Sequence, residues 1–201
     1  MNRMNATALF LLAVFPFGLA AEEIASEKDA KQEIGFSGKK YTPAPGVTQA
    51  TEIYKTTAEK DLEINLHFPA GWKAEDKRPV MVFFFGGGWK KGTTKQFLIQ
   101  ADYFASRGIV TARPNYRLAP DGVTPDKCVE DARSAVRWLR ANAARFGIDP
   151  KKVISAGGSA GGHLAYCTSI KRGADDRNDD PTISCIPQAM VLYNPALFYS
   201  D

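Results

Sequence analysis

The stretch V-I-S-A-G-G-S-A-G-G-H, residues 153–163, decides how the fold of this sequence is interpreted. A short apolar run is followed by glycines and alanines on both sides of a single serine, Ser159. A helical pattern comes next, and a flexible linker is not expected between an apolar strand and an amphipathic helix. The spacing at residues 157–161 is G-x-S-x-G, which in a strand-turn-helix context is typical of a nucleophile held on a sharp turn.

The glycines around Ser159 have a physical reason. A sharp strand-to-helix turn forces the serine into a strained backbone conformation and raises its hydroxyl above the sheet. The residues two before and two after it then lie against neighbouring backbone, where Gly157 and Gly161 avoid a Cβ clash. The helix that begins beyond the serine adds unpaired N–H groups and a positive dipole end. Ser159 is therefore the candidate nucleophile.

Apolar runs and helical patterns alternate along the rest of the chain. This alternation predicts an α/β domain with a mostly parallel sheet and helices on both faces. Buried strands are expected at 80–85, 108–113, 153–156 and 189–193. Helices are expected at 96–107, 125–146 and 159–170, with Gly108 and Gly147 ending the first two.

An antiparallel hairpin is expected before these elements. The run L-E-I-N-L-H-F, residues 62–68, alternates strictly between apolar and polar side chains, as in a half-exposed strand. Residues 51–57 are the expected partner strand, and 58–61 the turn. His67 belongs to the polar face of this edge-like strand, so we expect it at the surface.

A second motif, F-G-G-G-W at residues 85–89, ends the strand predicted at 80–85. A simple turn needs one or two glycines, and here three precede Trp89. Backbone without side chains lets N–H groups approach a ligand closely. These glycines can therefore donate hydrogen bonds to an oxyanion beside the N–H of Ala160.

Three motifs together resemble those of the hormone-sensitive-lipase-like esterases, a type of α/β-hydrolase. F-G-G-G-W at 85–89 is similar to that family's H-G-G-G-W, N-Y-R-L-A-P at 115–120 to its D-Y-R-L-A-P, and G-G-S-A-G-G at 157–162 to its G-D-S-A-G-G. The match runs from about Val80 to Pro195. It implies an α/β-hydrolase fold and hydrolysis of acyl esters by Ser159. It also implies an oxyanion hole made of three backbone N–H groups, those of Gly87, Gly88 and Ala160.

Two positions depart from the family pattern. Phe85 stands where the family has a histidine that helps to hold the oxyanion loop by hydrogen bonds, so packing is expected to hold the loop instead. Gly158 replaces an aspartate beside the nucleophile, as it does in other serine hydrolases. Tyr116 and Arg117 are expected to be structural residues that tie a loop near the site.

A serine hydroxyl needs a base, and the base needs an orienting acid. In this fold their chain order is serine, acid, histidine. The sequence holds two histidines, His67 before the nucleophile and His163 one helical turn after it, and neither is expected to be the base. Packing or hydrogen bonding behind the turn is the expected role of His163. We therefore expect the catalytic Asp and His, with the last strands, beyond residue 201, so that the 201-residue chain by itself is inactive.

The N-terminus is interpreted as an export signal. Arg3 precedes an uncharged run at residues 6–20, and small residues follow, which predicts a signal peptide at 1–20 cleaved near Ala20 or Ala21. The alternative is a membrane anchor, but the run is shorter than the roughly 20 residues of a spanning helix. Residues 21–50 are polar and contain prolines, which predicts a flexible leader. The hydrolase domain is then expected at 51–201.

Composition excludes several classes of protein. Apolar residues make up 44% and charged residues 24% of the 201 residues, which is typical of a globular domain. The net charge of +4 is spread along the chain, so no nucleic-acid partner is indicated. No metal or organic cofactor is implied. Four aspartates at 175–180 lack the spacing of a calcium loop and favour a solvated loop. Three cysteines (128, 167 and 185) form no disulfide framework, although one pair could form a bridge.

The favoured function is that of a secreted or periplasmic serine carboxylesterase. Its substrate would be a small-molecule or polysaccharide-linked ester with a short or acetyl acyl group, and the sequence defines no oligomeric state. An inactive α/β-hydrolase-like binding protein is the alternative from another class. A serine peptidase of the same fold is a third possibility, although such peptidases carry a large extra domain before the serine.

Overall fold

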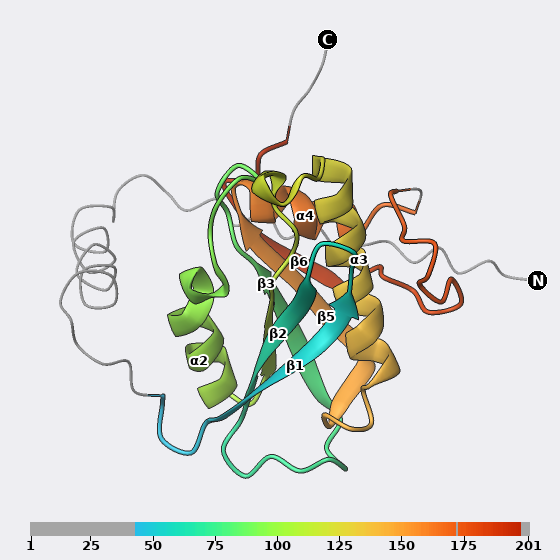
Figure 1. The fold of residues 1–201 in the computed structure, drawn as a ribbon. Helices are drawn as coiled ribbons and strands as arrows, with labels where there is room; N and C mark the ends of the chain where they lie inside the picture. Colours follow the sequence, from blue (N-terminus) through green and yellow to red (C-terminus); the bar gives the residue numbers. More distant parts are fainter. Residues whose placement is uncertain (1–42, 172, 198–201) are drawn as a thin grey trace, which may run out of the picture.

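A computed structural model describes residues 43–171 and 173–197 of the chain. The described residues form a six-stranded mixed sheet with the strand order β1-β2-β4-β3-β5-β6 (Figure 1). The strands are β1 (Thr48–Thr56), β2 (Asp61–Phe68), β3 (Arg78–Phe84), β4 (Val110–Pro114), β5 (Ile148–Gly158) and β6 (Ala189–Tyr193). The helices are α2 (Leu98–Ser106), α3 (Pro125–Ala141) and α4 (Ala160–Thr168), with short 3₁₀ turns η1 (Thr94–Phe97) and η2 (Ala119–Asp121).

The sheet has the predicted division into an antiparallel start and a parallel remainder. β1 and β2 pair in antiparallel register, and β2 continues antiparallel to β4. From β4 onward, β4, β3, β5 and β6 are all parallel. The α/β fold class and the N-terminal hairpin are therefore confirmed.

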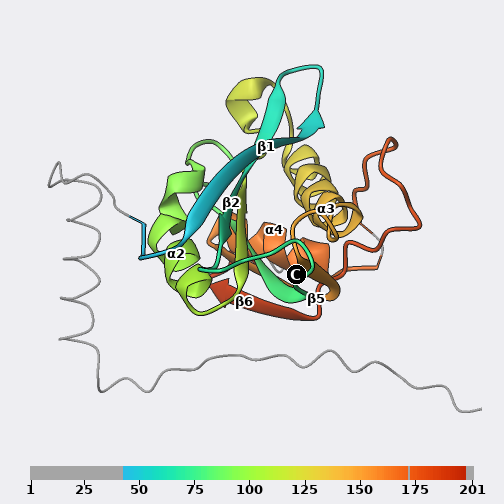
Figure 2. The same cartoon turned by 90° about the horizontal axis from the view of Figure 1, so that it is seen from below.

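Helices cover both faces of the sheet, α2 on one side and α3 with α4 on the other (Figures 1 and 2). Successive residues of β3 point to opposite faces, as strand geometry requires. Val80, Val82 and Phe84 therefore enter the large core under α3 and α4, whereas Met81 and Phe83 enter a smaller core under α2. Burial on both sides explains why the sequence of β3 is apolar without alternation. The strand predicted as buried at 189–193 is only partly buried, because β6 lies at the edge of the described sheet.

The predicted leader at residues 21–50 extends too far. The signal peptide at 1–20 and residues 21–42 lie outside the described residues, but β1 already begins at Thr48. Val47 is buried, and the N–H of Ala44 donates to Asp102 Oδ2 at 2.7 Å. Strand pairing and this contact with α2 bring residues 44–50 into the domain, even though their composition is that of a linker.

The helix predicted at 125–146 ends earlier, at Ala141. Residues 142–147 form tight turns instead, and the N–H of Arg78 donates to the carbonyl of Gly147 at 2.9 Å. Gly147 has a φ of +59°, and an added Cβ there would lie 2.4 Å from the carbonyl oxygen of Lys73. It permits a close turn between α3 and β5 rather than ending the helix directly.

His67 lies in the interior, so its predicted surface position was wrong. Its exposed fraction is 0% because β2 is paired on both edges and α2 covers this face. Its Nε2 lies 2.9 Å from Arg113 Nη2, and its Nδ1 lies 3.7 Å from Asp102 Oδ1. Of the polar face of this strand, Glu63 is exposed and Asn65 partly buried, whereas His67 is enclosed with Arg113 and Asp102. Alternation alone does not predict this burial.

Burial lowers the pKa of His67 from 6.5 to about 4, with a further contribution from Arg113 that Asp102 opposes in part. The unfolded chain binds a proton below pH 6.5, whereas the folded protein does so only near pH 4. We expect this difference to contribute stability above pH 6.5 that is lost as the pH falls to 4, about 3 kcal/mol in all.

Urea unfolding of wild type and His67→Gln at pH 7 and pH 4 measures this effect. The substitution should reduce the acid-induced loss of unfolding free energy by about 3 kcal/mol. His163→Gln is the matched control, because burial also lowers the pKa of His163. The His163 side chain is only partly buried, so this substitution should change the acid-induced loss less than His67→Gln does. An equal acid-induced loss in wild type and His67→Gln would contradict the expectation.

The aspartate-rich loop is exposed over much of its length, as predicted, but basic side chains also hold it against the domain. Asp175 pairs with Arg133 and Arg137 of α3, each at 2.6 Å. Asp179 pairs with Arg137 at 2.9 Å, and Asp176 pairs with Lys55 at 2.7 Å. Arg133 and Arg137 lie one turn apart on α3, so their ion pairs hold two points of the loop against this helix. In the described part of the chain, no group of three or more His, Cys, Asp or Glu side chains could hold a metal ion.

The three cysteines are free thiols, so no pair among them forms the bridge that the sequence left open. Cys128 and Cys185 are buried and Cys167 is partly buried. Burial raises the pKa of Cys128 to about 12 and that of Cys167 to about 11. These thiols are therefore core side chains rather than nucleophiles.

Candidate active site

Ser159 lies between the end of β5 and the start of α4, with a φ of +52° and a ψ of −120°. This is a region that non-glycine residues seldom adopt, so the predicted backbone strain is present. Three backbone hydrogen bonds hold the turn in place. The N–H of Ser159 donates to Tyr193 at 3.0 Å, and its carbonyl accepts from His163 at 3.0 Å and Ala196 at 2.9 Å. The residue itself is exposed.

The glycines on both sides of Ser159 are required by close backbone contacts, as predicted. A Cβ on Gly157 would lie 2.2 Å from the carbonyl oxygen of Gly161. A Cβ on Gly161 would lie 2.0 Å from the carbonyl oxygen of Phe84 and 2.4 Å from that of Phe85. Since real Cβ atoms do not approach backbone so closely, only glycine allows the turn to pack against the end of β3.

The F-G-G-G-W motif forms a loop, residues 85–92, that we call the glycine loop. It passes directly beside the serine: a Cβ on Gly86 would lie 3.3 Å from Ser159 Cβ and 2.7 Å from the carbonyl oxygen of Gly158. The carbonyl of Gly87 turns into the loop and accepts from the N–H groups of Lys90 and Lys91, both at 3.2 Å. Because a trans peptide is planar, the N–H of Gly88 then points away from those two residues.

The candidate oxyanion donors remain free for a ligand. Within residues 43–171 and 173–197, the N–H groups of Gly87, Gly88 and Ala160 donate to no protein acceptor. Gly87 is partly buried and Gly88 is exposed, while Ala160 is the first residue of α4. A helix N-terminus presents unpaired N–H groups and a positive dipole end. The site therefore has hydrogen-bond donors near the serine.

The glycine loop is held by hydrogen bonds as well as by the packing that the sequence predicted. The Phe85 ring stacks on the Tyr116 ring with centroids 4.2 Å apart, and the Tyr116 hydroxyl donates to the Phe85 carbonyl at 2.7 Å. Burial raises the pKa of Tyr116 well above its usual value, so the phenol stays a donor. The Gly86 N–H donates to Gln96 Oε1 at 2.5 Å. No sequence motif surrounds Gln96, so its role was not predicted.

Neither histidine is placed to act as a base for Ser159. His67 is enclosed between Arg113 and Asp102. His163 has the packing role expected for it: its ring meets the Trp89 ring edge-on at 5.3 Å, and its Nε2 lies 3.4 Å from Cys167 Sγ. In the described part of the chain, the Ser159 hydroxyl makes no hydrogen bond to either ring.

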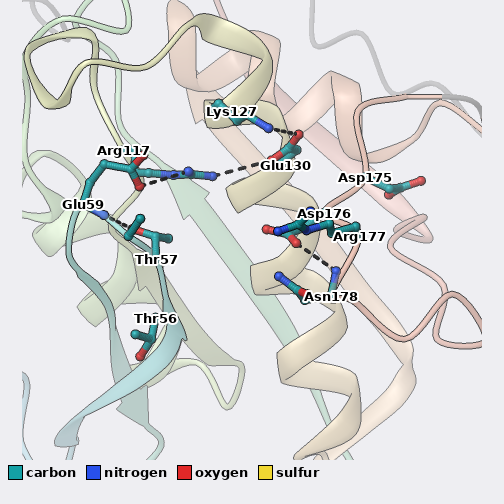
Figure 3. A pocket seen from close by; sticks show the side chains of 11 residues that line it. Thr56, Thr57, Glu59, Arg117, Lys127, Glu130, Asp175, Asp176, Arg177 and Asn178 are labelled. Carbon is teal, nitrogen blue, oxygen red and sulfur yellow. Dashed lines mark hydrogen bonds and ion pairs between the residues drawn. The ribbon is translucent and has the colours of Figure 1, made fainter.

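Arg117 is a structural residue, as expected from the N-Y-R-L-A-P motif. Its guanidinium makes a bidentate pair with buried Asp131, at 2.8 and 2.9 Å. Figure 3 shows the same side chain extending between Glu59 and Glu130, at 3.2 and 3.6 Å. It thereby ties the hairpin turn to α3. Arg117, Glu59 and Glu130 line a recess of about 390 Å³, and no residue of the glycine loop or of the turn at Ser159 is among its lining residues.

None of the helices in the described ranges is both long and apolar enough to cross a membrane.

Comparisons with known proteins agree with this geometry. The family model described as BD-FAE matches residues 64–186. Carboxylesterase NlhH of Mycobacterium tuberculosis is 35% identical over 107 residues, covering 52% of this chain and 32% of NlhH. The structure of Thermogutta terrifontis esterase 2 phosphorylated by paraoxon is 43% identical with a TM-score of 0.73, covering 79% of this chain and 61% of that one. Its butyrate-bound structure is 44% identical with a TM-score of 0.73, covering 78% and 56%.

The chain spans about a third of the length of NlhH and less than two thirds of the solved esterase. The matched region runs from within β2 past the end of α4 and includes the three motifs, with Ser159 and the glycine loop inside it. The match extends over more than half of the chain, and the solved structures share its arrangement of strands and helices. This protein therefore belongs to the BD-FAE family and has the α/β-hydrolase fold of the hormone-sensitive-lipase-like esterases.

Proposed function

We propose that this protein is a serine carboxylesterase in which Ser159 is the nucleophile. One observation carries the proposal: Ser159 is exposed on a strained turn, with the glycine loop packed against its Cβ. Strain at a non-glycine residue persists where the surrounding structure enforces it, and it is concentrated at functional sites. The named relatives, a carboxylesterase and an esterase, support ester hydrolysis as the reaction.

The reaction would proceed through an acyl-enzyme. The Ser159 hydroxyl loses its proton to a base as its oxygen attacks the ester carbonyl carbon, and the carbonyl oxygen becomes an oxyanion. The N–H groups of Gly87, Gly88 and Ala160 would stabilise this charge. The C–O bond to the alcohol then breaks, the alcohol takes the proton, and water releases the acid by the same steps.

A base is still required, and the two histidines of the sequence are engaged elsewhere. We propose that a His and its orienting Asp come from sequence beyond residue 201, in the order serine, acid, histidine. Activity is therefore tested on the protein encoded by the complete reading frame. The product of residues 1–201 is compared with it, and loss of general-base help alone should cost about 10²–10⁴-fold in rate.

We propose a short acyl group on the substrate, acetyl to butyryl. The surroundings of Gly158 support an aliphatic group: the rings of Phe97 and Tyr193 lie 5.8 Å apart there, and a Cβ on Gly158 would meet the Phe97 ring at 3.4 Å. Esterase 2 of Thermogutta terrifontis was solved with butyrate bound, which agrees with this size. The alcohol part, whether a small molecule or a polysaccharide, is left open by these contacts.

Titration with paraoxon tests the proposed nucleophile, because the related esterase was solved phosphorylated by this compound. We expect one equivalent of p-nitrophenol to be released and one diethylphosphoryl group to appear on the peptide that contains Ser159. The rate of p-nitrophenyl acetate hydrolysis should fall in proportion to the fraction of protein that carries this group. Labelling at another residue would contradict Ser159 as the nucleophile. No labelling together with no ester turnover would favour a binding protein built on the same fold.

We propose that the protein is exported, with residues 1–20 as a cleaved signal peptide. The support is the sequence pattern of Arg3, an uncharged run and small residues near Ala20. N-terminal sequencing of the secreted or periplasmic product should begin near Ala21 or Glu22. A mature protein that retains Met1 would contradict export by this route.

A further inference from the structure

Side chains form hydrogen bonds to both the C=O and the N–H of the peptide between Phe85 and Gly86. On one side the Tyr116 hydroxyl donates to the Phe85 carbonyl at 2.7 Å, and on the other the Gly86 N–H donates to Gln96 Oε1 at 2.5 Å. Gly86 is buried, and within the described ranges Gln96 is the acceptor for its N–H. A buried N–H without a partner costs about 1–3 kcal/mol, so the loop depends on this side chain.

Gln96 can hold the loop because its own backbone is firmly anchored. It belongs to η1, where Arg113 Nη1 donates to the Thr94 carbonyl at 2.6 Å and the Thr94 hydroxyl donates to Asn65 Oδ1 at 2.8 Å. The next residue, Phe97, is buried and stacks on Phe83 with centroids 5.3 Å apart. The exposed amide of Gln96 is therefore carried by a turn that is fixed to β2, β3 and β4.

The orientation of the first peptide decides where the next N–H groups point. A planar peptide with both its C=O and its N–H held cannot rotate. Two peptides further on, the Gly87–Gly88 peptide is also held, because the Gly87 carbonyl accepts from the N–H groups of Lys90 and Lys91. The Gly86–Gly87 peptide lies between these two held peptides, and among the described residues it has no such hydrogen bonds of its own. Its N–H, that of Gly87, is one of the two donors that the glycine loop would offer to an oxyanion.

We propose that Gln96 is a positioning residue for the oxyanion hole: by accepting the Gly86 N–H it aims the donors of Gly87 and Gly88 at the carbonyl that Ser159 attacks. It takes the part that the family's histidine at position 85 would have in holding the loop. The proposal rests on the proposed esterase function, but the tether itself is a property of the folded chain and can be tested separately.

The tether is tested by amide hydrogen exchange at Gly86, followed by NMR in wild type and three variants. Gln96→Met keeps the length of the side chain but offers only a weak acceptor, and we expect Gly86 to exchange at least about tenfold faster, the ratio for a lost bond of about 1.4 kcal/mol. Gln96→Glu keeps an acceptor oxygen and should retain the slow exchange. Lys95→Met changes the neighbouring exposed residue of η1 and should have no effect. Unchanged Gly86 exchange in Gln96→Met would overturn the inference.

The positioning role is tested on p-nitrophenyl acetate with the protein from the complete reading frame. Rates are divided by the concentration of Ser159 that paraoxon titrates, which removes any effect of a smaller folded fraction. We expect Gln96→Met to lower kcat about tenfold and to leave KM within about twofold of the wild-type value. The loss is smaller than the 10²–10³-fold that removal of an oxyanion-hole donor causes, because the donors are misaligned rather than deleted. Lys95→Met should match wild type.

The outcomes separate the two proposals. If wild type and Ser159→Ala hydrolyse the ester equally, the esterase proposal fails, and the exchange experiment alone decides whether Gln96 holds the loop. If Ser159 is titrated and essential but Gln96→Met retains full kcat per titrated serine, the esterase stands and the positioning role is overturned.

Discussion

Replacing Ser159 with alanine should lower kcat/KM for p-nitrophenyl acetate by about 10⁴-fold or more in the protein from the complete reading frame. The loss is large because the proposed reaction forms its covalent bond through Ser159 Oγ, which alanine lacks. The donors of Gly87, Gly88 and Ala160 would remain, but an oxyanion hole without its nucleophile accelerates the reaction only weakly. The free energy of unfolding should change little, because Ser159 is exposed and its hydroxyl makes no hydrogen bond to a residue that the structure describes.

Ser106→Ala is the matched control, because it also removes an exposed serine hydroxyl but lies on α2. Its kcat/KM should equal that of wild type. Paraoxon should label this variant fully and should leave Ser159→Ala unlabelled. Turnover by Ser159→Ala within tenfold of wild type would place the reaction elsewhere in the protein.

The second large effect is expected at Asp131, which is fully buried in α3. Its carboxylate pairs with Arg117 through two hydrogen bonds and with Lys55 Nζ at 2.8 Å, and it also accepts the N–H of Arg117. Asp131→Ala leaves a buried guanidinium whose remaining ion pairs among the described residues are those with Glu59 and Glu130, at 3.2 and 3.6 Å. Removing one partner of a buried pair costs about 3–5 kcal/mol, which we expect as the loss of unfolding free energy in urea.

Lys152→Ala is the control for this prediction, because it also breaks an ion pair. Lys152 Nζ lies 3.2 Å from Asp149 Oδ2, but the lysine side chain is 61% exposed. Exposed pairs contribute at most about 1 kcal/mol, so this variant should unfold almost as wild type does. If Asp131→Ala cost less than 1 kcal/mol, the Arg117 network would not be what fastens the hairpin turn to α3.

Local patterns were sufficient to predict most of the architecture. Strict alternation at residues 62–68 indicated β2, and the apolar runs indicated the strands of the parallel sheet, because a strand buried on both faces has no need of polar side chains. The G-x-S-x-G spacing indicated a strained turn because its reason is steric and lies within five residues. The positive φ of Ser159 and the close contacts of Gly157 and Gly161 agree with that reasoning.

Positions whose environment comes from distant residues were not predictable in the same way. His67 resembles a surface residue in its own strand, but α2 and Arg113 enclose it. The aspartates at 175–179 lie in a loop that is largely exposed, as predicted, but their ion pairs with the arginines of α3 were not predicted. Residues 44–50 resemble a leader, but pairing with β2 and a bond to Asp102 bring them into the domain.

The sequence by itself thus determined the α/β fold class, the turn that presents Ser159 and the glycine loop that accompanies it. Each depends on short-range sterics and on apolar periodicity, which neighbouring residues carry. Tyr116 was expected to tie a loop near the site, but only the tertiary structure decided that Gln96 and Tyr116 bond to the two sides of one peptide, across 10 and 31 residues of chain. A hydrogen bond between distant segments has no local pattern, because its geometry arises only when the sheet brings the two segments together.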